Sequence, residues 1–409
     1  WEGPVYQQGD RQGVRYQHIN FHSDNKRIVV VSDKGGSERL EIHHIKESKR
    51  PLVFPSLDFG RPSEIKLAPT KDLAAIVNHR NELLIVDLNK KSLTFVDKSK
   101  FHIIAGFNWS PDSRYIAYTC SEGIHSQIIK VFDRNTGETH AVTESISGDF
   151  SPVFDPKGKY LYFLSNRIFN PVYDDIQFEL SFPMGTKPFA IALTREIPSP
   201  FVKEAASFSK TLPPNKNKGK EKNKDTNIEV KIDFETIRDR VVAFPISEAI
   251  YEDIQAIEGK VFYTVRTIEG SRRSTWFDLA PAAKASLKVF DFDEQIEKLF
   301  SGNVTDFKIS QKCDTILIRS GNSLRLLSTK DAPSKENGEK VAPGKKSGKI
   351  DLTRIQVPIE PLQEWQQMYA EAWRLQRDHF WVENMSGVDW KKVYNRYFPL
   401  IKRVGSRSE

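Results

Sequence analysis

The chain alternates short apolar runs with turns rich in Pro, Asp, Lys and Gly. One unit of this pattern is INFHSDNKRIVVVSD at residues 19–33, with an apolar pair, a polar turn and an apolar run of strand length. Short runs of β-branched and aromatic residues bounded by turn residues are typical of β-strands. The unit returns at residues 65–79, 107–121 and 152–166, and weaker copies lie at 254–267 and 307–321.

The clear copies are evenly spaced. Ser23, Pro69, Pro111 and Pro156 hold the same place in them, so the steps are 46, 42 and 45 residues. A period of about 40–45 residues with four short strands per unit is typical of β-propeller blades. A blade cannot bury both faces alone, whereas a ring of blades covers each face with a neighbour. The pattern predicts an all-β propeller of about seven blades, six of them recognisable.

The stretch between the fourth and fifth copies is longer than one plain blade. Residues 156–257 hold either two blades or one blade with a large insertion. They contain the run FNPVYDDIQFELSFPMG at 169–185 and a Lys-rich loop at about 203–228, so an insertion is at least as well supported. Part of a further blade is expected from the N-terminal residues.

The net charge of +7 is concentrated in two segments. Residues 215–225 contribute +3, and residues 330–349 contribute another +3. Both segments are too polar to fold by burial, and the remaining body is close to neutral. A basic groove interleaved with aromatic residues is not seen, so the lysines are interpreted as solvated and no nucleic-acid partner is expected.

The chain also lacks the marks of a membrane or exported protein. No stretch approaches the roughly 18 apolar residues that span a bilayer. The first residues, WEGPVYQQGD, have no basic and apolar leader pattern. Two cysteines, Cys120 and Cys313, are too few for a disulfide framework or a thiolate zinc site. We expect a cytoplasmic protein in a reducing compartment, without a membrane partner.

Near the end of the chain the pattern changes from strand to helix. Residues 349–359 are interpreted as a last strand, closed by Pro358 and Pro361. A helix is predicted next, with one stripe of large residues at helical spacing: Trp365, Met368, Tyr369, Ala372, Trp373, Gln376 and Phe380. A second helix follows, with Asp389 as its N-cap and with Trp390, Val393, Tyr394 and Tyr397 facing one way.

These patterns predict two domains. The propeller covers residues 1–357, with Lys-rich loops at about 203–228 and 330–349, and a helical segment covers residues 358–409. Ser406 and Glu409 have the spacing of a capping box, and Gly405 suits the positive φ that closes a helix. The tail is therefore interpreted as the start of another domain; helices that cap the propeller are the alternative.

A search for catalytic and metal-binding patterns finds none that is complete. No G-x-S-x-G elbow occurs. Nine histidines are scattered along the chain: His18, His22, His43, His44, His79, His102, His125, His140 and His379. His43 and His44 point to opposite faces of a predicted strand. His18 and His22 are roughly 13 Å apart along another strand, too far for one ion. We predict no catalytic residue, metal or cofactor in this chain.

Three weaker candidates remain. His379, on or beside the apolar stripe, is a possible base, although a core or boundary position fits it better. The acid pair Asp174–Asp175 fits turn capping better than catalysis. Arg167, Tyr173 and Asp174 belong to the long insertion after a predicted blade strand. We hypothesise that this insertion gates a propeller pore; the alternative is a loop packed on the neighbouring blade.

Several runs of the chain resemble the tricorn protease family. They are FNWSPDSRYIAY, GKYLYFLSNRIFNPVYD, KPFAIALTREIPSPF and the whole tail from EWQQMYAEAW to GSRSE. The likeness covers nearly all of the chain. It matches the family's second, seven-bladed propeller and the opening helices of its first core subdomain. The tail also resembles the tail-specific serine peptidases.

The resemblance implies a large cytosolic serine peptidase that trims oligopeptides downstream of the proteasome or similar proteases. Such enzymes combine two propellers, a PDZ-like domain and two core subdomains, and they form hexamers. The seven-bladed propeller is implied to be a channel that admits peptides and excludes folded proteins, as well as a scaffold.

The resemblance carries no catalytic residue onto this chain, because the family's His and adjacent Ser lie shortly after the GSRSE position, and its nucleophilic Ser and Glu lie further on. The two Lys-rich insertions depart from the family. The alternative function is a stand-alone β-propeller interaction module without an enzymatic parent.

Overall fold

The computed structural model describes most of the chain, namely residues 13–46, 49–54, 57–144, 148–202, 228–269, 282–330 and 342–409. The Lys-rich loop at about 203–228, apart from residue 228, lies outside the described residues. So do residues 331–341 of the second Lys-rich stretch and the first residues of the chain.

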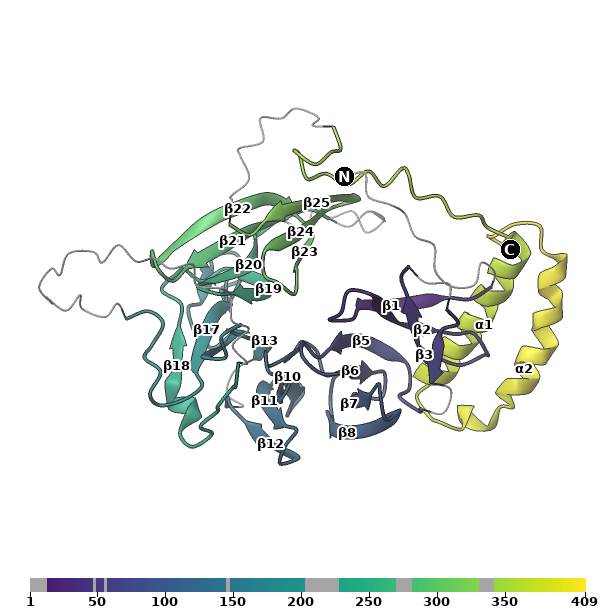
Figure 1. Ribbon diagram of the computed structural model, residues 1–409, viewed down its shortest axis with the longest axis horizontal. Helices are drawn as coiled ribbons and strands as arrows, with labels where there is room; N and C mark the ends of the chain where they lie inside the picture. Colours follow the sequence, from purple (N-terminus) through teal and green to yellow (C-terminus); the bar gives the residue numbers. More distant parts are fainter. Residues whose placement is uncertain are drawn as a thin grey trace, which may run out of the picture. The chain divides into compact units, whose positions relative to one another are not determined.

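The described residues form six blade sheets, in which sequential strands pair antiparallel (Figure 1). The first sheet contains β1 (Tyr16–Phe21), β2 (Arg27–Ser32), β3 (Arg39–His44) and β4 (Leu52–Phe54). The second contains β5 (Pro62–Leu67), β6 (Leu73–Asn78), β7 (Glu82–Asp87) and β8 (Ser92–Lys98). The third contains β9 (Phe107–Trp109), β10 (Tyr115–Ser121), β11 (Gln127–Asp133) and β12 (Glu138–Ala141).

The other three sheets are β13 (Asp149–Phe154), β14 (Tyr160–Ser165), β17 (Lys187–Ala192) and β18 (Val241–Ala243); β19 (Ile250–Ile257), β20 (Lys260–Arg266), β21 (Ala285–Asp291) and β22 (Ile296–Val304); and β23 (Asp306–Ile309), β24 (Thr315–Ser320) and β25 (Ser323–Ser328). The all-β propeller class is thus confirmed, with the six recognisable blades. The seventh blade of the resemblance is not among the described residues.

Each copy of the sequence repeat is the hairpin that joins the first two strands of a blade. The turn places a residue with positive φ at a recurring position, which is Asn25, Ser113, Gly158, Gly259 or Cys313 in five of the blades. Glycine adopts this conformation at no steric cost, and asparagine adopts it more readily than most residues. The turn chemistry of the repeat therefore sets the register in which the apolar run pairs.

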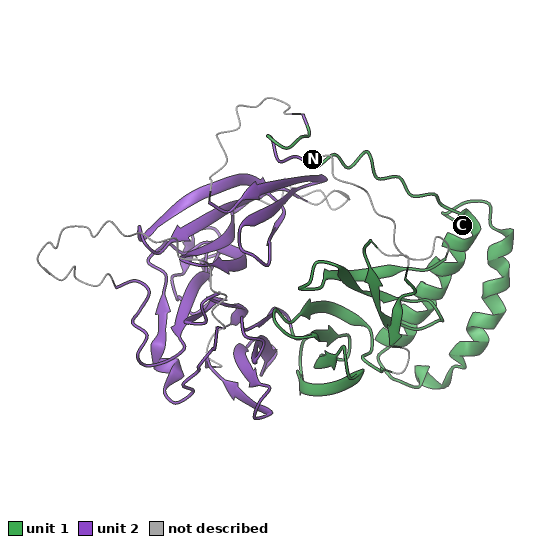
Figure 2. Ribbon diagram, viewed as in Figure 1, with its two compact units in different colours: residues 1–104, 343–346, 350–409 green, residues 105–342, 347–349 purple. Residues whose placement is uncertain are grey.

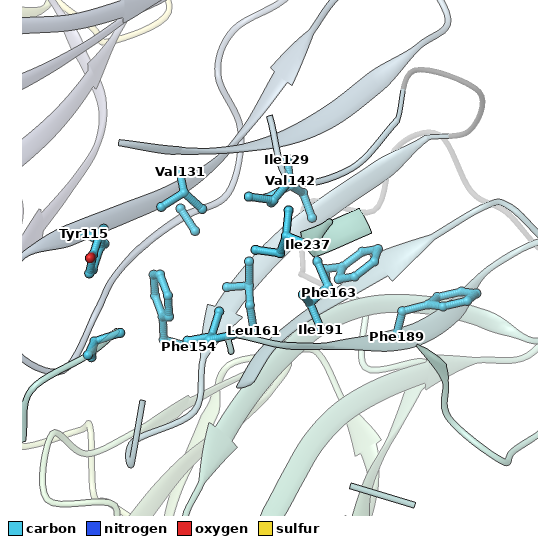
Figure 3. Packing of buried hydrophobic residues seen from close by; sticks show 13 residues of the cluster. Tyr115, Ile129, Val131, Val142, Phe154, Leu161, Phe163, Phe189, Ile191 and Ile237 are labelled. Atoms are coloured by element: carbon cyan, nitrogen blue, oxygen red, sulfur yellow. The ribbon is translucent and has the colours of Figure 1, made fainter. Parts of the chain in front are cut away.

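The core consists of apolar clusters between successive blade sheets. One cluster joins the third blade sheet (β9–β12) to the fourth (β13, β14, β17 and β18) and includes Ile129, Phe163 and Phe189 (Figure 3). Another joins the first two blades through residues such as Val31, Phe59 and Ile76. Further clusters join the fourth sheet to the fifth and the fifth to the sixth. Blade faces are buried against neighbouring blades, as the repeat predicts.

Polar side chains on the first strands also bridge neighbouring blades. In β9, the Asn108 side-chain oxygen accepts from Phe154 N in β13 at 3.1 Å. In β19, the Gln255 amide donates to Phe307 O and accepts from Ile309 N, both at 2.9 Å. His18 Nε2 in β1 lies 3.0 Å from Pro62 O in β5. Backbone groups in the first strand of one blade are therefore paired by a side chain from the preceding blade.

The chain divides into two compact units (Figure 2). One consists of residues 1–104, 343–346 and 350–409; the other consists of residues 105–342 and 347–349. The first unit holds blades β1–β4 and β5–β8 together with the helical tail. The second unit holds the remaining four blade sheets.

Residues 156–257 contain one blade with insertions and not two blades, which is one of the two alternatives from the sequence. Strands β14, β17 and β18 complete the fourth blade, and β19 (Ile250–Ile257) already begins the fifth. Between β14 and β17 lies a separate two-stranded sheet, β15 (Val172–Asp174) and β16 (Glu179–Ser181). Between β17 and β18 the described residues include the short 3-10 helix η1 (Ile237–Arg240). Residues 169–185, which contain β15 and β16, are called the insertion hairpin below.

The tail contains α1 (Pro361–His379), η3 (Met385–Gly387), α2 (Trp390–Tyr397) and η4 (Phe398–Arg403). Asp389 is the N-cap of α2, as predicted, since its carboxylate accepts from Lys392 N at 2.9 Å. The predicted strand over 349–359 is wrong. Only Lys349 bridges to Arg325, and Pro361 begins α1 instead of closing a strand. None of the described helices combines the length and apolar character needed to span a bilayer.

The capping box is formed in part. Glu409 Oε2 accepts from Ser406 N at 3.1 Å, which is the back-reaching half of the motif, and also from Gly405 N at 2.6 Å. Ser406 Oγ lies 3.1 Å from Ser408 Oγ. Gly405 is not among the residues with positive φ, so the predicted left-handed closure is wrong. Val404 instead follows η4 in an extended conformation.

Candidate functional site

Helix α1 has a charged face and an aromatic face, and its most buried residues are charged. Glu371 and Arg374 are buried, whereas the large residues of the predicted stripe are only partly so. The charged face lies against loops and strands of the first two blades. The group of Arg15, Asp33, Glu38, Arg61, Glu371, Arg374 and Asp378 is called the docking cluster below.

Asp33, which directly follows β2, is the anchor of the docking cluster. Its Oδ2 accepts from Arg374 Nη2 at 2.6 Å and from Gln367 Nε2 at 3.0 Å. Its Oδ1 accepts from the backbone N of Arg15 at 2.8 Å. Burying an ion pair costs desolvation energy, and this cost is offset only when additional hydrogen bonds satisfy the remaining polar atoms of the charged groups. Because both oxygens of the Asp33 carboxylate accept hydrogen bonds, Asp33 fixes the position of α1 along blade 1.

Glu371 extends the cluster from blade 1 to blade 2. Its Oε2 accepts from Arg374 Nη2 at 2.8 Å, one turn along the helix. Its Oε1 pairs with the guanidinium groups of Arg15 and Arg61. Because Arg61 lies just before β5, one carboxylate of α1 contacts both blades of its unit.

The far end of the cluster is less completely paired. Arg61 Nη1 lies 3.4 Å from Glu38 Oε1 and 3.8 Å from Asp378 Oδ2, and neither contact is a hydrogen bond. Burial raises the pKa of Glu38 above its ordinary value, although the positive charge of Arg61 opposes this. Burial likewise lowers the pKa of Arg61. The ions here carry a desolvation cost that hydrogen bonds offset only in part.

A cavity of about 420 Å³ lies beside this end of the cluster, lined by Ser37, Glu38, Leu57, Asp58, Gly60, Arg61, His79, Arg80, Arg377 and Asp378. His379 is exposed, and its ring meets that of His79 edge-on at 5.6 Å. His379 thus occupies a boundary position. Burial lowers the pKa of His79, which favours its neutral form.

The aromatic face of α1 packs on the rest of the tail. Trp373 and Trp390 stack with an interplanar angle of 10°, and each indole donates to the other's backbone oxygen, at 2.8 Å and 3.0 Å. Tyr394 packs against Tyr369 and Phe398. Tyr369 and Trp373 of the predicted stripe therefore form an interhelical contact, whereas Ala372 and Gln376 of the stripe are exposed. Other apolar side chains of the tail remain exposed, Trp381 (81%) most of all.

Arg167 is a structural member of blade 4. Its Nη2 donates to the buried Asp149 at 2.7 Å, and its Nε donates to Ser165 Oγ at 3.1 Å. The guanidinium carbon lies 4.9 Å from the ring centre of Phe189 and 5.4 Å from that of Phe163. These contacts fix the side chain, which suits a rigid base for the insertion better than a moving gate.

The insertion hairpin itself is exposed. Tyr173 faces Leu180 across the two strands, and Asp174 faces Glu179. Asp174 Oδ1 accepts from Ile176 N at 2.9 Å, which confirms its expected turn-capping role. A cavity of about 680 Å³ lies at the hairpin's base, lined by Asn166, Arg167, Ile168, Phe169, Phe182, Pro183, Gly185, Thr186 and Ile250.

Other histidines have structural partners. His43 Nε2 lies 2.8 Å from Glu41, and His22 Nε2 lies 2.6 Å from Asp72 of the next blade. His43 is buried and its neighbour His44 is half-buried. Across the described parts of the chain, no three His, Cys, Asp or Glu side chains converge as a metal site.

Sequence reasoning missed the docking cluster. A signal was present, because Gln367, Glu371, Arg374 and Asp378 form a second stripe at helical spacing, opposite the aromatic one. Such a stripe ordinarily faces solvent. Its partners Asp33 and Arg61 lie more than 300 residues away, and the sequence alone does not pair them.

Comparisons with known proteins match the whole chain to one family. The family model "Tricorn protease second beta propeller domain" matches residues 1–330, and "Tricorn protease C1 domain" matches residues 361–409. A Tricorn-like protease C-terminal subunit from Sulfurisphaera tokodaii is 33% identical over 100% of this chain and 44% of the relative. A Tricorn protease homolog from Saccharolobus solfataricus is 31% identical over 100% of this chain and 35% of the relative.

The fold comparison agrees. A crystal structure of the tricorn protease aligns with a TM-score of 0.79 and 21% identity, over 96% of this chain and 36% of that chain. This chain thus spans less than half the length of the curated relatives named here. Because the models of the second propeller domain and of the C1 domain match successive parts of the chain, the chain belongs to the tricorn protease family.

Proposed function

We propose that residues 1–409 are the non-catalytic propeller and core-start portion of a tricorn-like serine peptidase. In this proposal residues 1–357 form the propeller, and residues 358–409 begin the peptidase core. The parent degrades oligopeptides downstream of the proteasome or similar proteases in the cytoplasm. The catalytic Ser, His and Glu are supplied by the parent outside this chain.

The docking cluster is the observation that carries the proposal. It attaches the first helix of the core-start match to two blades through Asp33, Arg61, Glu371 and Arg374. Because these ions are buried, the helix is held in one register, and misplacement leaves an unpaired charge. A propeller that positions a catalytic domain needs such a fixed connection. The exposed apolar residues of the tail, such as Trp381, supply a surface for the remaining core.

The proposed role of the propeller is that of a substrate filter and scaffold within a hexameric parent, next to a PDZ-like domain and further core subdomains. The insertion hairpin is the proposed gate. Deleting residues 169–185 in the assembled parent should change peptide uptake; unchanged uptake would exclude a gating role.

A side-by-side peptidase assay tests the proposal. The parent should cleave a set of fluorogenic oligopeptides, and residues 1–409 alone should not. Arg374→Met in the parent should lower turnover while the propeller stays folded, because the core helix loses its anchor. Hydrolysis by the 409-residue chain itself, or a parent without peptidase activity, would contradict the proposal. The second result would favour the stand-alone interaction module.

A further inference from the structure

The insertion hairpin presents a dense apolar surface to solvent. Eight of its large side chains are exposed: Phe169, Val172, Tyr173, Ile176, Phe178, Leu180, Phe182 and Met184. Ile176 is 87% exposed and Phe169 is 78% exposed. Single exposed apolar residues are ordinary, but a concentration on one short segment marks an interaction surface.

The backbone of the hairpin also has unused pairing capacity. Among the described residues, β15 and β16 pair only with each other. A two-stranded hairpin is marginally stable by itself, and each of its outer edges offers N–H and C=O groups to a further strand. Strand addition by an extended peptide uses such an edge, with side chains entering neighbouring pockets.

The charge of the hairpin narrows the choice of ligand. Residues 169–185 contain Asp174, Asp175 and Glu179 and no Lys or Arg, so the segment carries a charge of −3. Asp174 and Glu179 face each other across the strands, and like charges in this position destabilise a sheet. A basic ligand relieves that repulsion. A second hairpin from another copy brings the same acidic residues and increases it.

The cavity at the base of the hairpin provides the specific pocket. Its volume of about 680 Å³ lies within the range of roughly 300–1,000 Å³ that is usual for ligand sites. Phe169 and Phe182, whose ring centres are 5.2 Å apart, supply the apolar wall. Asn166 and Thr186, joined by a 2.8 Å hydrogen bond, supply polar groups.

We propose that the insertion hairpin and its base cavity bind an extended peptide with alternating apolar and basic side chains. The peptide adds to the hairpin as a third strand, places an apolar side chain in the cavity and sets a cation against Asp174 and Glu179. This rests on the proposed function in taking peptides as the ligand class, and it adds a binding surface on the propeller.

Fluorescence anisotropy tests the site on the 409-residue chain. The probe is a fluorescein-labelled peptide of alternating Val and Lys; a Val and Glu peptide and an N-methylated Val and Lys peptide are the comparison ligands. Leu180→Ser should weaken binding of the first probe roughly tenfold. Glu179→Lys should reverse the preference between the Lys and Glu peptides. Leu299→Ser is the matched control and should leave binding unchanged, because Leu299 in β22 is 62% exposed and Leu180 is 57% exposed.

Three results would overturn the inference: equal binding by Leu180→Ser, equal binding of the N-methylated peptide, or a dimer in sedimentation analysis that Leu180→Ser dissolves. The last result assigns the surface to a second copy. These results can be distinguished from a failure of the proposed function. If the parent hydrolyses no peptide but probe binding still depends on Leu180, the peptidase proposal fails and the binding site stands.

Discussion

Asp33 and Arg374 are separated by 341 positions in the sequence, yet their carboxylate and guanidinium meet at 2.6 Å, both of them buried. The pair connects the end of β2 with the middle of α1. Its geometry makes the first tail helix part of the same compact unit as the first two blades.

Arg374→Met should release or destabilise α1. The substitution keeps an unbranched apolar stem but removes the guanidinium, so Asp33 and Glu371 stay buried without their shared cation. Removing one partner of a buried ion pair costs about 3–5 kcal/mol. Hydrogen exchange of α1 and thermal unfolding measure the effect. Arg377→Met is the control on the same helix, because that side chain is 42% exposed and its pair should be worth about 1 kcal/mol or less. Equal effects of the two variants would contradict the assigned role.

Gln255→Ala should weaken the junction between the fifth and sixth blades. It removes both hydrogen bonds to the sixth blade, together with a longer one to Asp253 Oδ2 at 3.4 Å. It leaves the Ile309 N–H without its partner, at a cost of about 1–3 kcal/mol. Exchange of the Ile309 amide should accelerate, and the denaturation midpoint should fall. Gln177→Ala, at an exposed turn of the insertion hairpin, should change neither.

Asp253→Asn should alter the pH dependence of stability. Burial raises the pKa of Asp253 to about 6, above the roughly 4 of an unfolded aspartate. The folded chain therefore holds the proton more tightly. The stability gained from that proton is present below about pH 4 and lost as pH rises through about 6.

The free energy of unfolding of the Asn variant should match that of the unsubstituted 409-residue chain at pH 4. At pH 7.5 it should be larger by up to about 3 kcal/mol. Thermal unfolding at the two pH values measures this. Glu252→Gln, on the more exposed side of the same strand, should give no such difference. If the Asn variant were less stable than the unsubstituted chain at pH 7.5, ionisation of Asp253 would not destabilise the fold as expected.

Gly158→Ala should be more harmful than the equivalent change in the next blade. Both Gly158 and Gly259 have positive φ, so alanine costs about 1–2 kcal/mol at either position. A Cβ at 158 would also lie 2.7 Å from a methyl carbon of Val230, whereas nothing lies within 4 Å at 259. Chemical denaturation should separate the two variants, and adding Val230→Ala should bring Gly158→Ala back toward Gly259→Ala.

Much of the fold could be predicted from the sequence because the repeat encodes local turns. The hairpins around Pro111 and Pro156 depend on residues within one blade, and so does the Asp389 cap. The docking cluster could not be predicted, since it joins Asp33 and Arg61 to a helix far along the chain. The strand expected over 349–359 failed because an apolar run forms a strand only where a partner edge is present.

The amide bridges of Asn108 and Gln255 imply that the blades tolerate change one junction at a time. Each bridge connects a blade to the one that follows it, so a substitution at one junction destabilises the more distant junctions only weakly. A single blade can therefore be lengthened or carry insertions, as the fourth blade does, while the structure of the other blades is retained.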